Sequence, residues 1–474
     1  MYLKIISITL LLAIANQAEA KQKETDVWTE GNRVAASVEL PKITNTEYLI
    51  TNYGASPDSA ALHNGNAINK AIDDASCKGG GKVIIPAGIW LTGPIDLKSG
   101  VNLVLSKGAV LKFSTIHEHY LPVVRTRWEG IDCYNLHPLI YAYKQTDIAI
   151  TGEGTIDGQG SVETWWHWCG SAKKYGWKEG MLRQNAPGHG RVKLTEYEQT
   201  GVDIEQRRMG IADALRPQLI NIFDCERVLI ENVTLKNSPF WVIHPVWVNH
   251  LTVRGVNISS HGPNSDGCDP ESSKNVLIEN CVFDTGDDCI AIKSGRNNDG
   301  RLWNRPSENI VVRNCKMKDG HGGIVVGSEI TGGYRNLWIE NCQMDSPELE
   351  RVVRIKTNPC RGGVIENIFV RNITVGQCKE AVLKINLDYE PREACKRDFP
   401  PIVRNVFVEN VTSQKSKYGI FIIGLADTEN IENVVVRNCD WNGVEKGNRI
   451  DGKVGEITFS NYKQNGEKMK NPKR

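Results

Sequence analysis

NVLIENC, which spans Asn275–Cys281, decides the fold, because variants of this phrase recur along the C-terminal half of the chain. Each copy is rich in β-branched residues that alternate with polar ones, which predicts one short strand per copy. Successive copies begin about 23 to 38 residues apart, the spacing of a solenoid in which every turn contributes such a strand. The other copies are RVLIENV from Arg227, HLTVRGV from His250, NIVVRNC from Asn309, NLWIENC from Asn336, NIFVRNI from Asn367, NVFVENV from Asn405 and NVVVRNC from Asn433.

The sixth position of every copy holds asparagine or glycine. Both residue types tolerate the left-handed region of backbone conformation, so we expect every coil to bend there. Asparagine amides stacked at this position can also hydrogen-bond from coil to coil. We therefore predict an all-β fold, a single-stranded parallel β-helix with coils about 4.8 Å apart. The residues at this position are Asn232, Gly255, Asn280, Asn314, Asn341, Asn372, Asn410 and Asn438.

The chain contains 13 cysteines, an odd number that leaves at least one without an intramolecular partner. Four of them, Cys281, Cys315, Cys342 and Cys439, occupy the seventh position of the repeat, where other copies carry valine or isoleucine. These four are predicted to be small buried hydrophobic residues rather than members of disulfides. Which other cysteines pair does not follow from the spacing.

The N-terminus has the features of a signal peptide. Lys4 precedes the apolar run Ile5–Ala15, and Ala18-Glu19-Ala20 has the small-x-small pattern that a signal peptidase cleaves. We expect residues 1–20 to be removed on export, which predicts a secreted or periplasmic protein. The apolar run is short for a membrane span. A net charge of +1, from 57 basic and 56 acidic residues, favours neither a nucleic-acid nor a membrane partner.

Residues 21–474 are predicted to form a single β-helix domain. Its N-terminal cap covers about residues 45–115 and includes Ala67–Ala75, whose helical spacing suits a capping helix over the open end of the solenoid. Residues 158–216 break the repeat and are predicted to form a long inserted loop. A tryptophan cluster in this loop would either stack against sugars or pack on the coils, and packing is the commoner role. The cluster comprises Trp165, Trp166 and Trp168.

A second strand of each coil can be aligned by its alternation of apolar residues. The alignment points two columns of side chains into the core and leaves the intervening residues on the outer face. The aligned segments are DGCDPES from Asp266, DCIAIKS from Asp288, GGIVVGS from Gly322 and VVRIKTN from Val352. The inward columns are Cys268, Ile290, Ile324 and Val353, and then Pro270, Ile292, Val326 and Ile355.

Ionisable residues from four coils converge on one patch of this outer face. Asp266 and Asp288 lie two residues ahead of the first inward column, so we expect them one coil apart on the same edge. Asp287 and His321 each follow a turn asparagine by seven residues and should also lie on adjacent coils. The last two residues of the patch, one coil further along, are Arg354 and Lys356.

Such a patch suits the hydrolysis of an acidic sugar. Like charges a few ångströms apart raise the pKa of at least one carboxyl group, which provides an acid beside a base. A glycosidase needs this pairing to protonate the leaving oxygen and to activate water. Arg354 and Lys356 supply cations for a substrate carboxylate. Calcium binding is a rival interpretation, because clustered aspartate oxygens are its preferred ligands.

Four motifs resemble the polygalacturonase family, glycoside hydrolase family 28, in order and spacing. They are Asn264-Ser265-Asp266, Gly286-Asp287-Asp288, Gly320-His321-Gly322 and Arg354-Ile355-Lys356. The segments TNYGASPD, PAGIWLTGPI and SPFWVIHPV are also similar to bacterial members, so the likeness covers nearly the whole mature chain. The resemblance implies a right-handed parallel β-helix that hydrolyses α-1,4-galacturonosyl linkages with inversion, without a metal or other cofactor.

Carried over by position, the family's roles fall on seven residues. Asp287 would be the general acid, and His321 would tune it. Asp266 and Asp288 would hold and activate water. The residues that bind the polysaccharide or oligogalacturonide substrate would be Arg354, Lys356 and Asn264.

Exo action is favoured by two features of the resemblance. Ser265 stands where many endo-acting members have threonine, and Gly320–Glu329 (GHGGIVVGSE) is more similar to exo-acting bacterial members. The inserted loop can also close one end of a cleft. The alternatives are a hydrolase of rhamnogalacturonan or another decorated pectin backbone, a calcium-dependent β-helix pectate lyase, and a non-catalytic carbohydrate-binding β-helix. Oligomeric state is not predicted.

Overall fold

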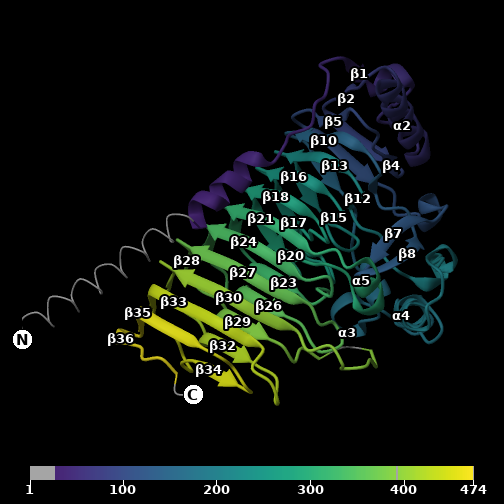
Figure 1. The fold of residues 1–474 in the computed structure, drawn as a ribbon. Coiled ribbons are helices and arrows are strands. Elements are labelled where there is room, and N and C mark those ends of the chain that lie inside the picture. Colours follow the sequence, from purple (N-terminus) through teal and green to yellow (C-terminus); the bar gives the residue numbers. More distant parts are fainter. Residues whose placement is uncertain (1–26, 391–392, 473–474) are drawn as a thin grey trace, which may run out of the picture.

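The computed structural model describes residues 27–390 and 393–472 and confirms the right-handed parallel β-helix (Figure 1). The predicted signal segment, residues 1–20, lies outside the described residues. No helix in the described part is long and apolar enough to cross a membrane. The strands run across the molecule in rows, one row for each face of the coils.

The repeat phrases form the first row of strands, and each pairs in parallel with the phrase of the next coil. Val276, for example, faces Leu251 of the preceding coil and Ile310 of the following one. The row consists of β1 (Glu47–Leu49), β2 (Gly81–Ile85), β5 (Val101–Leu105), β10 (Thr146–Gly152), β13 (Glu226–Glu231), β16 (Asn249–Arg254), β18 (Lys274–Glu279), β21 (Ser307–Arg313), β24 (Tyr334–Glu340), β27 (Val364–Arg371), β30 (Ile402–Glu409), β33 (Ile431–Trp441) and β35 (Ile457–Gln464).

The chain bends after each phrase and enters a second row of shorter strands. All eight residues at the predicted turn position have left-handed backbone, with φ between 52° and 63°. The second row consists of β3 (Gly88–Thr92), β6 (Ala109–Phe113), β11 (Thr155–Asp157), β14 (Thr234–Lys236), β17 (Asn257–Ser260), β19 (Val282–Thr285), β22 (Lys316–Met317), β25 (Gln343–Met344), β28 (Thr374–Val375) and β31 (Thr412–Ser413). At the C-terminal end, β36 (Glu467–Lys468) pairs antiparallel with β35.

The third row contains the predicted second strand of each coil. Isolated bridges from Ile243 to Cys268 and from Cys268 to Ile290 join its two sheets into one face. The first sheet consists of β4 (Ile95–Asp96), β9 (Ile140–Tyr143), β12 (Ile220–Phe223) and β15 (Ile243–Val246). The second consists of β20 (Ile290–Ile292), β23 (Ile324–Gly327), β26 (Arg351–Lys356), β29 (Ala381–Asn386), β32 (Tyr418–Ile423) and β34 (Arg449–Asp451).

Asparagine stacking is more extensive than the sequence analysis expected. The predicted column forms some amide bonds, such as Asn372 Nδ2 to Asn341 Oδ1 at 3.1 Å. A second column, formed by Asn249 and by the first residue of each later phrase, makes an uninterrupted series of six bonds of 2.8 to 3.3 Å from Asn249 to Asn433. Each bond satisfies a polar group at a bend and links one coil to the next.

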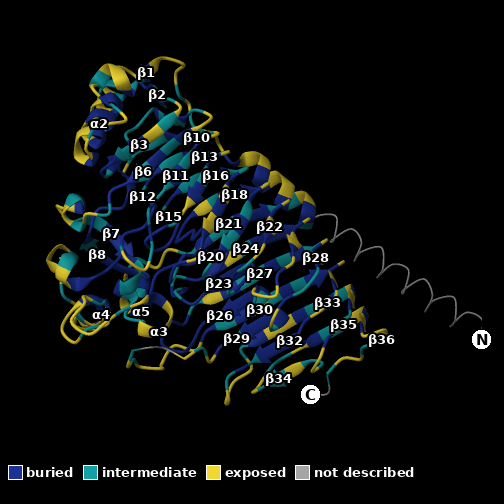
Figure 2. Ribbon diagram, turned by 180° about the vertical axis from the view of Figure 1, so that it is seen from behind, coloured by how far each residue is buried: buried dark blue, intermediate teal, exposed yellow. Residues whose placement is uncertain are grey.

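The interior is a continuous apolar core along the axis (Figure 2). The four cysteines of the repeat are buried in it, as predicted. One disulfide, Cys360–Cys395, is present among the described residues, and its two cysteines lie outside the repeat position. The disulfide joins the turn after β26 to the segment that follows β29.

The predicted capping helix is present as α2 (Ala61–Cys77), which is longer than the nine residues used to predict it. Its buried face, including Ile68 and Ile72, covers the first coils. A second helix, over residues 27–37, was not predicted. It packs through Trp28 and Val34 on the outer face of β18, β21 and β24 and is the purple helix beside the strands in Figure 1.

Residues 158–216 form most of the connection from β11 in the second row to β12 in the third row, and they contain mostly short helical segments. Trp165 and Trp168 are buried, and their ring centroids lie 4.4 and 4.3 Å, respectively, from that of His117. The packing interpretation of the tryptophan cluster is therefore confirmed. Besides α2 and the helix over residues 27–37, the helical segments in the described part of the chain are η1 (Ile50–Tyr53), η2 (His117–Tyr120), η3 (Trp166–Cys169), α3 (Ala172–Tyr175), α4 (Gly190–Thr200), η4 (Ile204–Gln206), η5 (Ile211–Asp213) and α5 (Asn297–Trp303). The hairpin of β7 (Val124–Trp128) and β8 (Ile131–Asn135) lies beside them.

Candidate active site

The predicted strand alignment is correct, and it brings the three aspartates together. Ile290 pairs with Ile324, and Ile324 pairs with Val353, as the alignment required. The backbone amide of Gly267 donates to the carbonyl of Asp288 at 3.0 Å, which sets Asp266 and Asp288 on neighbouring coils. Carboxylate oxygens of Asp266, Asp287 and Asp288 lie within 4.8 Å of one another.

Asp287 lies beside His321, the neighbour that the turn spacing predicted. Nδ1 of the imidazole is 2.9 Å from Oδ1 of the carboxylate. Both side chains are partly exposed, 42% for His321 and 19% for Asp287, whereas those of Asp266 and Asp288 are at most 5% exposed. Asp287 is therefore the carboxyl group of the three that a substrate reaches most directly.

Asp288 lies at the base of the two predicted substrate-binding cations. Nζ of Lys356 donates to Oδ2 of Asp288 at 2.7 Å, and the Arg354 guanidinium lies 3.5 Å from Oδ1. The Nε atom of Arg354 is buried and makes no hydrogen bond within the protein. A buried donor without a partner is costly, so the site favours an oxygen ligand at this position.

The protonation tendencies of these carboxyl groups differ. Burial raises the pKa of Asp266 well above its usual range, and the nearby charges of Asp269 and Asp287 raise it further. Burial also raises the pKa of Asp287, but the hydrogen bond and charge of His321 outweigh it, with help from Lys356, and lower that pKa overall. The hydrogen bond to Asp287 in turn raises the pKa of His321. Both shifts favour an ion pair between the His321 imidazolium and the Asp287 carboxylate in the free protein.

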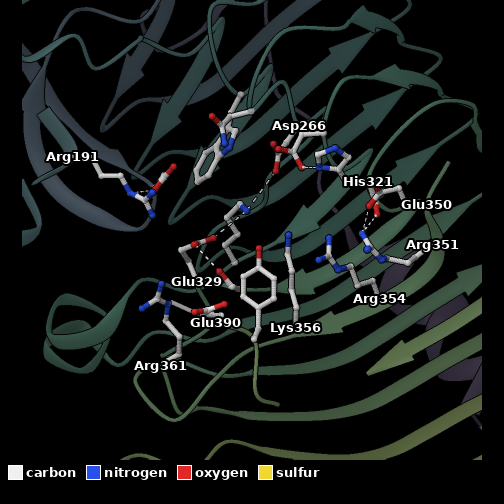
Figure 3. Close-up of a pocket in the computed structure, with 17 residues that line it drawn as sticks. Arg191, Asp266, His321, Glu329, Glu350, Arg351, Arg354, Lys356, Arg361 and Glu390 are labelled. Atoms are coloured by element: carbon white, nitrogen blue, oxygen red, sulfur yellow. Dashed lines mark hydrogen bonds and ion pairs between the residues drawn. The ribbon is translucent and has the colours of Figure 1, made fainter. Parts of the chain in front are cut away.

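A cavity of about 320 Å³ opens over these residues (Figure 3). Asp266, Asp287, His321, Arg354 and Lys356 all line it. Asp288 is covered by Arg354 and Lys356 and does not line the cavity. Asn264, the remaining predicted site residue, also lines the cavity, and its Oδ1 accepts from Arg216 at 2.9 Å.

Several cavity residues were not among the predicted site residues. Lys293 stood on the outer face of an aligned strand, and its alternation with Ala291 was the signal that could have identified it. Its ammonium lies 3.6 Å from Asp266 and 4.4 Å from the centre of the Trp241 ring. Arg351 begins β26, and Arg191 lies on α4. The others come from loops or from the β7–β8 hairpin, which have no repeat register: Glu129, Trp241, Ser328, Glu329, Glu350, Arg361, Tyr389 and Glu390.

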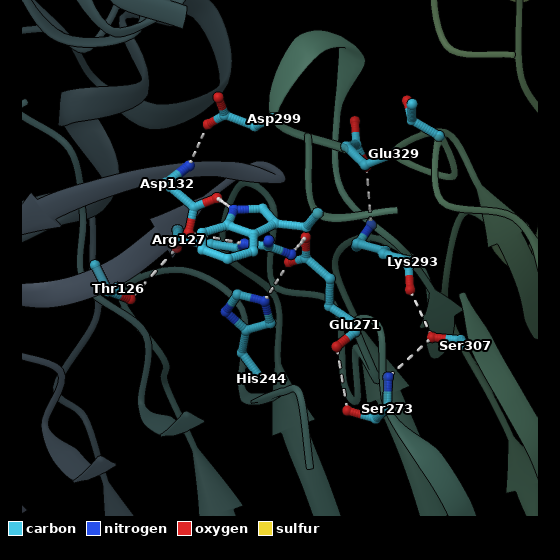
Figure 4. Close-up of polar contacts among 12 residues, drawn as sticks. Thr126, Arg127, Asp132, His244, Glu271, Ser273, Lys293, Asp299, Ser307 and Glu329 are labelled. Atoms are coloured by element: carbon cyan, nitrogen blue, oxygen red, sulfur yellow. Dashed lines mark hydrogen bonds and ion pairs between the residues drawn. The ribbon is translucent and has the colours of Figure 1, made fainter. Parts of the chain in front are cut away.

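A buried polar network fixes the wall beside Lys293 (Figure 4). Arg127 on β7 lies 2.9 Å from Glu271, and Glu271 lies 2.9 Å from His244 on β15. Lys293 continues the network toward Glu329, whose carboxylate is 3.3 Å away. The contacts join the β7–β8 hairpin to the third row of strands, so the hairpin cannot move independently of the cavity floor.

The three aspartates have the spacing of a metal-binding group, which is the calcium alternative. The charges around them oppose a divalent cation. The ammonium groups of Lys293 and Lys356 lie 3.6 and 2.7 Å from Asp266 and Asp288, respectively, where they compete for the carboxylate oxygens. The donor set fits an acid–base site better than a calcium site.

The fold and the site together define a glycoside hydrolase built on a parallel β-helix. The chain belongs to the family described as glycosyl hydrolases family 28, whose sequence model matches residues 211–428. The crystal structure of a hyperthermoactive exopolygalacturonase from Thermotoga maritima has a TM-score of 0.87 and 38% sequence identity, over 93% of this chain and 97% of that one.

Two sequence relatives agree with this classification. An exo-poly-alpha-D-galacturonosidase of Dickeya chrysanthemi is 27% identical over 456 residues, which cover 90% of this chain and 72% of the relative. A probable polygalacturonase of Vitis vinifera is 31% identical over 344 residues, 70% of this chain, and the match spans 61% of the relative's own length.

Proposed function

We propose that the protein hydrolyses α-1,4-galacturonosyl linkages of polygalacturonate from a chain end. The observation that carries the proposal is the cavity in which Asp287 and His321 face Arg354 and Lys356. Carboxyl groups on adjacent coils supply an acid and a base, and the two cations suit a uronate carboxylate. An exo-acting sequence relative and an exo-acting solved structure, each matched over at least 90% of this chain, support this substrate class and mode of action.

The reaction assigns a different task to each aspartate. Asp287 donates a proton to the glycosidic oxygen as its bond to the anomeric carbon breaks. Asp266 and Asp288 hold a water molecule, accept its proton, and direct its oxygen to the same carbon. The products are two shorter chains, and the elements of water are shared between them.

Substrate binding itself favours protonation of Asp287. In the free protein the positive charges of His321 and Lys356 lower the pKa of this carboxyl group. A uronate carboxylate docked on Arg354 and Lys356 would offset part of that charge and add a negative one nearby. Both effects raise the pKa of Asp287. Its carboxyl group would therefore carry a proton when an acidic sugar is bound.

Inversion is part of the proposal and requires its own test. The nearest oxygens of the three aspartates lie within 4.8 Å, closer than the ~6.5 to 9.5 Å between carboxyl groups that is typical of inverting enzymes. The family resemblance supports inversion, and NMR of the first-formed product on polygalacturonate decides it. A β-anomer at early times is expected, and an α-anomer would contradict inversion.

The same digestion tests the substrate. We expect reducing ends to appear from unbranched polygalacturonate, with one short product from the beginning. Activity confined to rhamnogalacturonan would favour the decorated-backbone alternative, and an unsaturated product that disappears on chelation would indicate a lyase. We also propose export with removal of residues 1–20, which Edman sequencing of the mature protein checks by a first residue of Lys21.

A further inference from the structure

Five charged residues form a continuous set of ion pairs at one end of the cavity, which we call the ionic wall. Glu129 lies 3.0 Å from Arg191 and 3.4 Å from Arg296. Glu393 lies 2.7 Å from both Arg296 and Arg361. The wall therefore joins five parts of the chain: the β7–β8 hairpin, α4, the start of α5, and the two segments linked by the disulfide.

The ionic wall separates two cavities. Glu129, Arg191 and Arg361 line the active-site cavity, and Figure 3 places Arg191 and Arg361 at the end away from His321 and Arg351. On its other side, a second cavity of about 480 Å³ is lined by residues of the inserted loop and of the segment after β29. Its lining includes Gln184, Asn185, Arg191, Thr195, Gln199 and Glu393.

We propose that the ionic wall sets the length of the released product by stopping the substrate between the two cavities. The inference rests on the proposed hydrolysis of polygalacturonate and identifies the part of this chain that would make it exo-acting. A chain end that reaches Arg191 and Arg361 meets paired, mostly buried charges and can advance no further. The sugars between the wall and Asp287 are then the ones released.

The second cavity is suited to more sugar residues if the wall is opened. Its carboxamide and hydroxyl side chains, on Gln184, Asn185, Thr195 and Gln199, are donors and acceptors for sugar hydroxyl groups. Removing Arg191, the side chain common to both cavities, would connect them. A longer stretch of substrate would then have hydrogen-bonding partners beyond the wall, and cleavage at interior linkages would become possible.

The disulfide holds the wall in place from one side. Cys360 precedes Arg361, and Cys395 follows Glu393 by two residues, so the covalent link spans the Arg361–Glu393 ion pair. The amide of Phe399 also donates to the carbonyl of Pro359 at 2.9 Å between the same two segments. Reduction would leave this ion pair without its covalent support and loosen the wall.

The test compares the products of wild type, Arg191→Ala and Glu393→Ala on decagalacturonate, resolved by chromatography at low conversion. Arg183→Ala is the matched control, because Arg183 lies in the same inserted loop, stacks on Trp177 and lines neither cavity. We expect one product length from wild type and from the control. Each wall variant should release products of mixed length. Products that differ in length from the wild-type product should make up a share at least tenfold larger than in wild type.

Each outcome is decisive. A single unchanged product from both wall variants, at retained activity, would overturn the role of the wall. If either variant fails to fold, wild type treated with a thiol reductant provides the same comparison. An unchanged product length, once thiol titration shows that Cys360 and Cys395 are reduced, counts against the proposal. Mixed products from wild type would also overturn it, while hydrolysis itself would stand. A wild type inactive on polygalacturonate would instead refute the proposed function.

Discussion

Replacement of Asp287 by asparagine is the most direct test of the catalytic site. Asp287→Asn preserves the shape of the side chain and keeps an oxygen that can accept from Nδ1 of His321, now 2.9 Å from the carboxylate. It removes the proton that the proposed reaction delivers to the glycosidic oxygen. Asp266 and Asp288 are nearly buried and keep their lysine partners, so neither can take over protonation of the leaving oxygen.

The expected loss of turnover is large. A positioned general acid contributes about 10²- to 10⁴-fold, which corresponds to about 3 to 5 kcal/mol in the activation barrier. Substrate binding should change much less, because Arg354 and Lys356 are untouched. Global stability should also change little, since Asp287 is partly exposed and the asparagine keeps one hydrogen bond.

The assay is the initial rate of reducing-end release from polygalacturonate, with thermal unfolding as the check on folding. Asp284→Asn is the matched control, because Asp284 pairs with His261 at 3.1 Å in the same manner but lies outside the cavity. An aryl galacturonide with a good leaving group needs less protonation, so it should restore much of the rate of Asp287→Asn and not that of Asp266→Asn. A rate within tenfold of wild type on polygalacturonate would refute the assignment.

Three further predictions concern recognition, pH and stability. Lys356→Ala should lose about 10- to 100-fold more activity on free polygalacturonate than on fully methyl-esterified pectin; equal losses in paired rate measurements would contradict carboxylate docking. The pKa of His321 is raised above 6.5, so its ion pair with Asp287 stabilises the folded chain most below that pH, and this stabilisation is lost as pH rises through the raised pKa. The melting temperature should therefore fall over this pH range, and His321→Gln should flatten the fall. An identical pH profile of the variant would count against the pair. Asn336→Ala removes amide bonds to Asn309 and Asn367 at a left-handed φ of 68° and should cost about 3 kcal/mol in urea unfolding, whereas Asn336→Gly should cost about 1 kcal/mol less; equal costs would show that the backbone conformation is unimportant.

The parts of the site that could be predicted are those fixed by the period of the coil. Once the repeat was aligned, the register of Ile290, Ile324 and Val353 followed, and with it the positions of the neighbouring polar residues. A one-residue slip would have turned the apolar columns outward, so the hydrophobic pattern determined the alignment. The contact between Asp287 and His321 followed from the same regularity.

The closed end of the cavity could not be predicted, because the residues that form it have no period. Arg191 comes from α4, and Glu129 from the tip of a hairpin. Their meeting depends on how the inserted loop packs, including the burial of Trp168. The partner of Cys395 was equally inaccessible, since Cys360 and Cys395 lie in turns whose spacing varies from coil to coil.

Each of the three aspartates has a nitrogen partner of its own, and the chemistry of that partner separates their roles. Two partners are ammonium groups, which ordinarily stay charged over the whole range in which such an enzyme works. The third is an imidazole, which gains and loses its proton in that range. The pairs are Asp266 with Lys293 at 3.6 Å, Asp288 with Lys356 at 2.7 Å and Asp287 with His321 at 2.9 Å.

This difference resolves the apparent conflict between the lowered pKa of Asp287 and its proposed role as the acid. A carboxyl group that must give up a proton in every cycle also needs a source from which to regain it. The lysines beside Asp266 and Asp288 supply positive charges that hold these carboxyl groups in place, which suits groups proposed to position water. His321 holds a proton against Asp287, and the pKa of each depends on the charge of the other. If a docked uronate shifts that balance as proposed, the proton needs to cross only the 2.9 Å hydrogen bond to reach Asp287, the carboxyl group proposed to protonate the leaving oxygen.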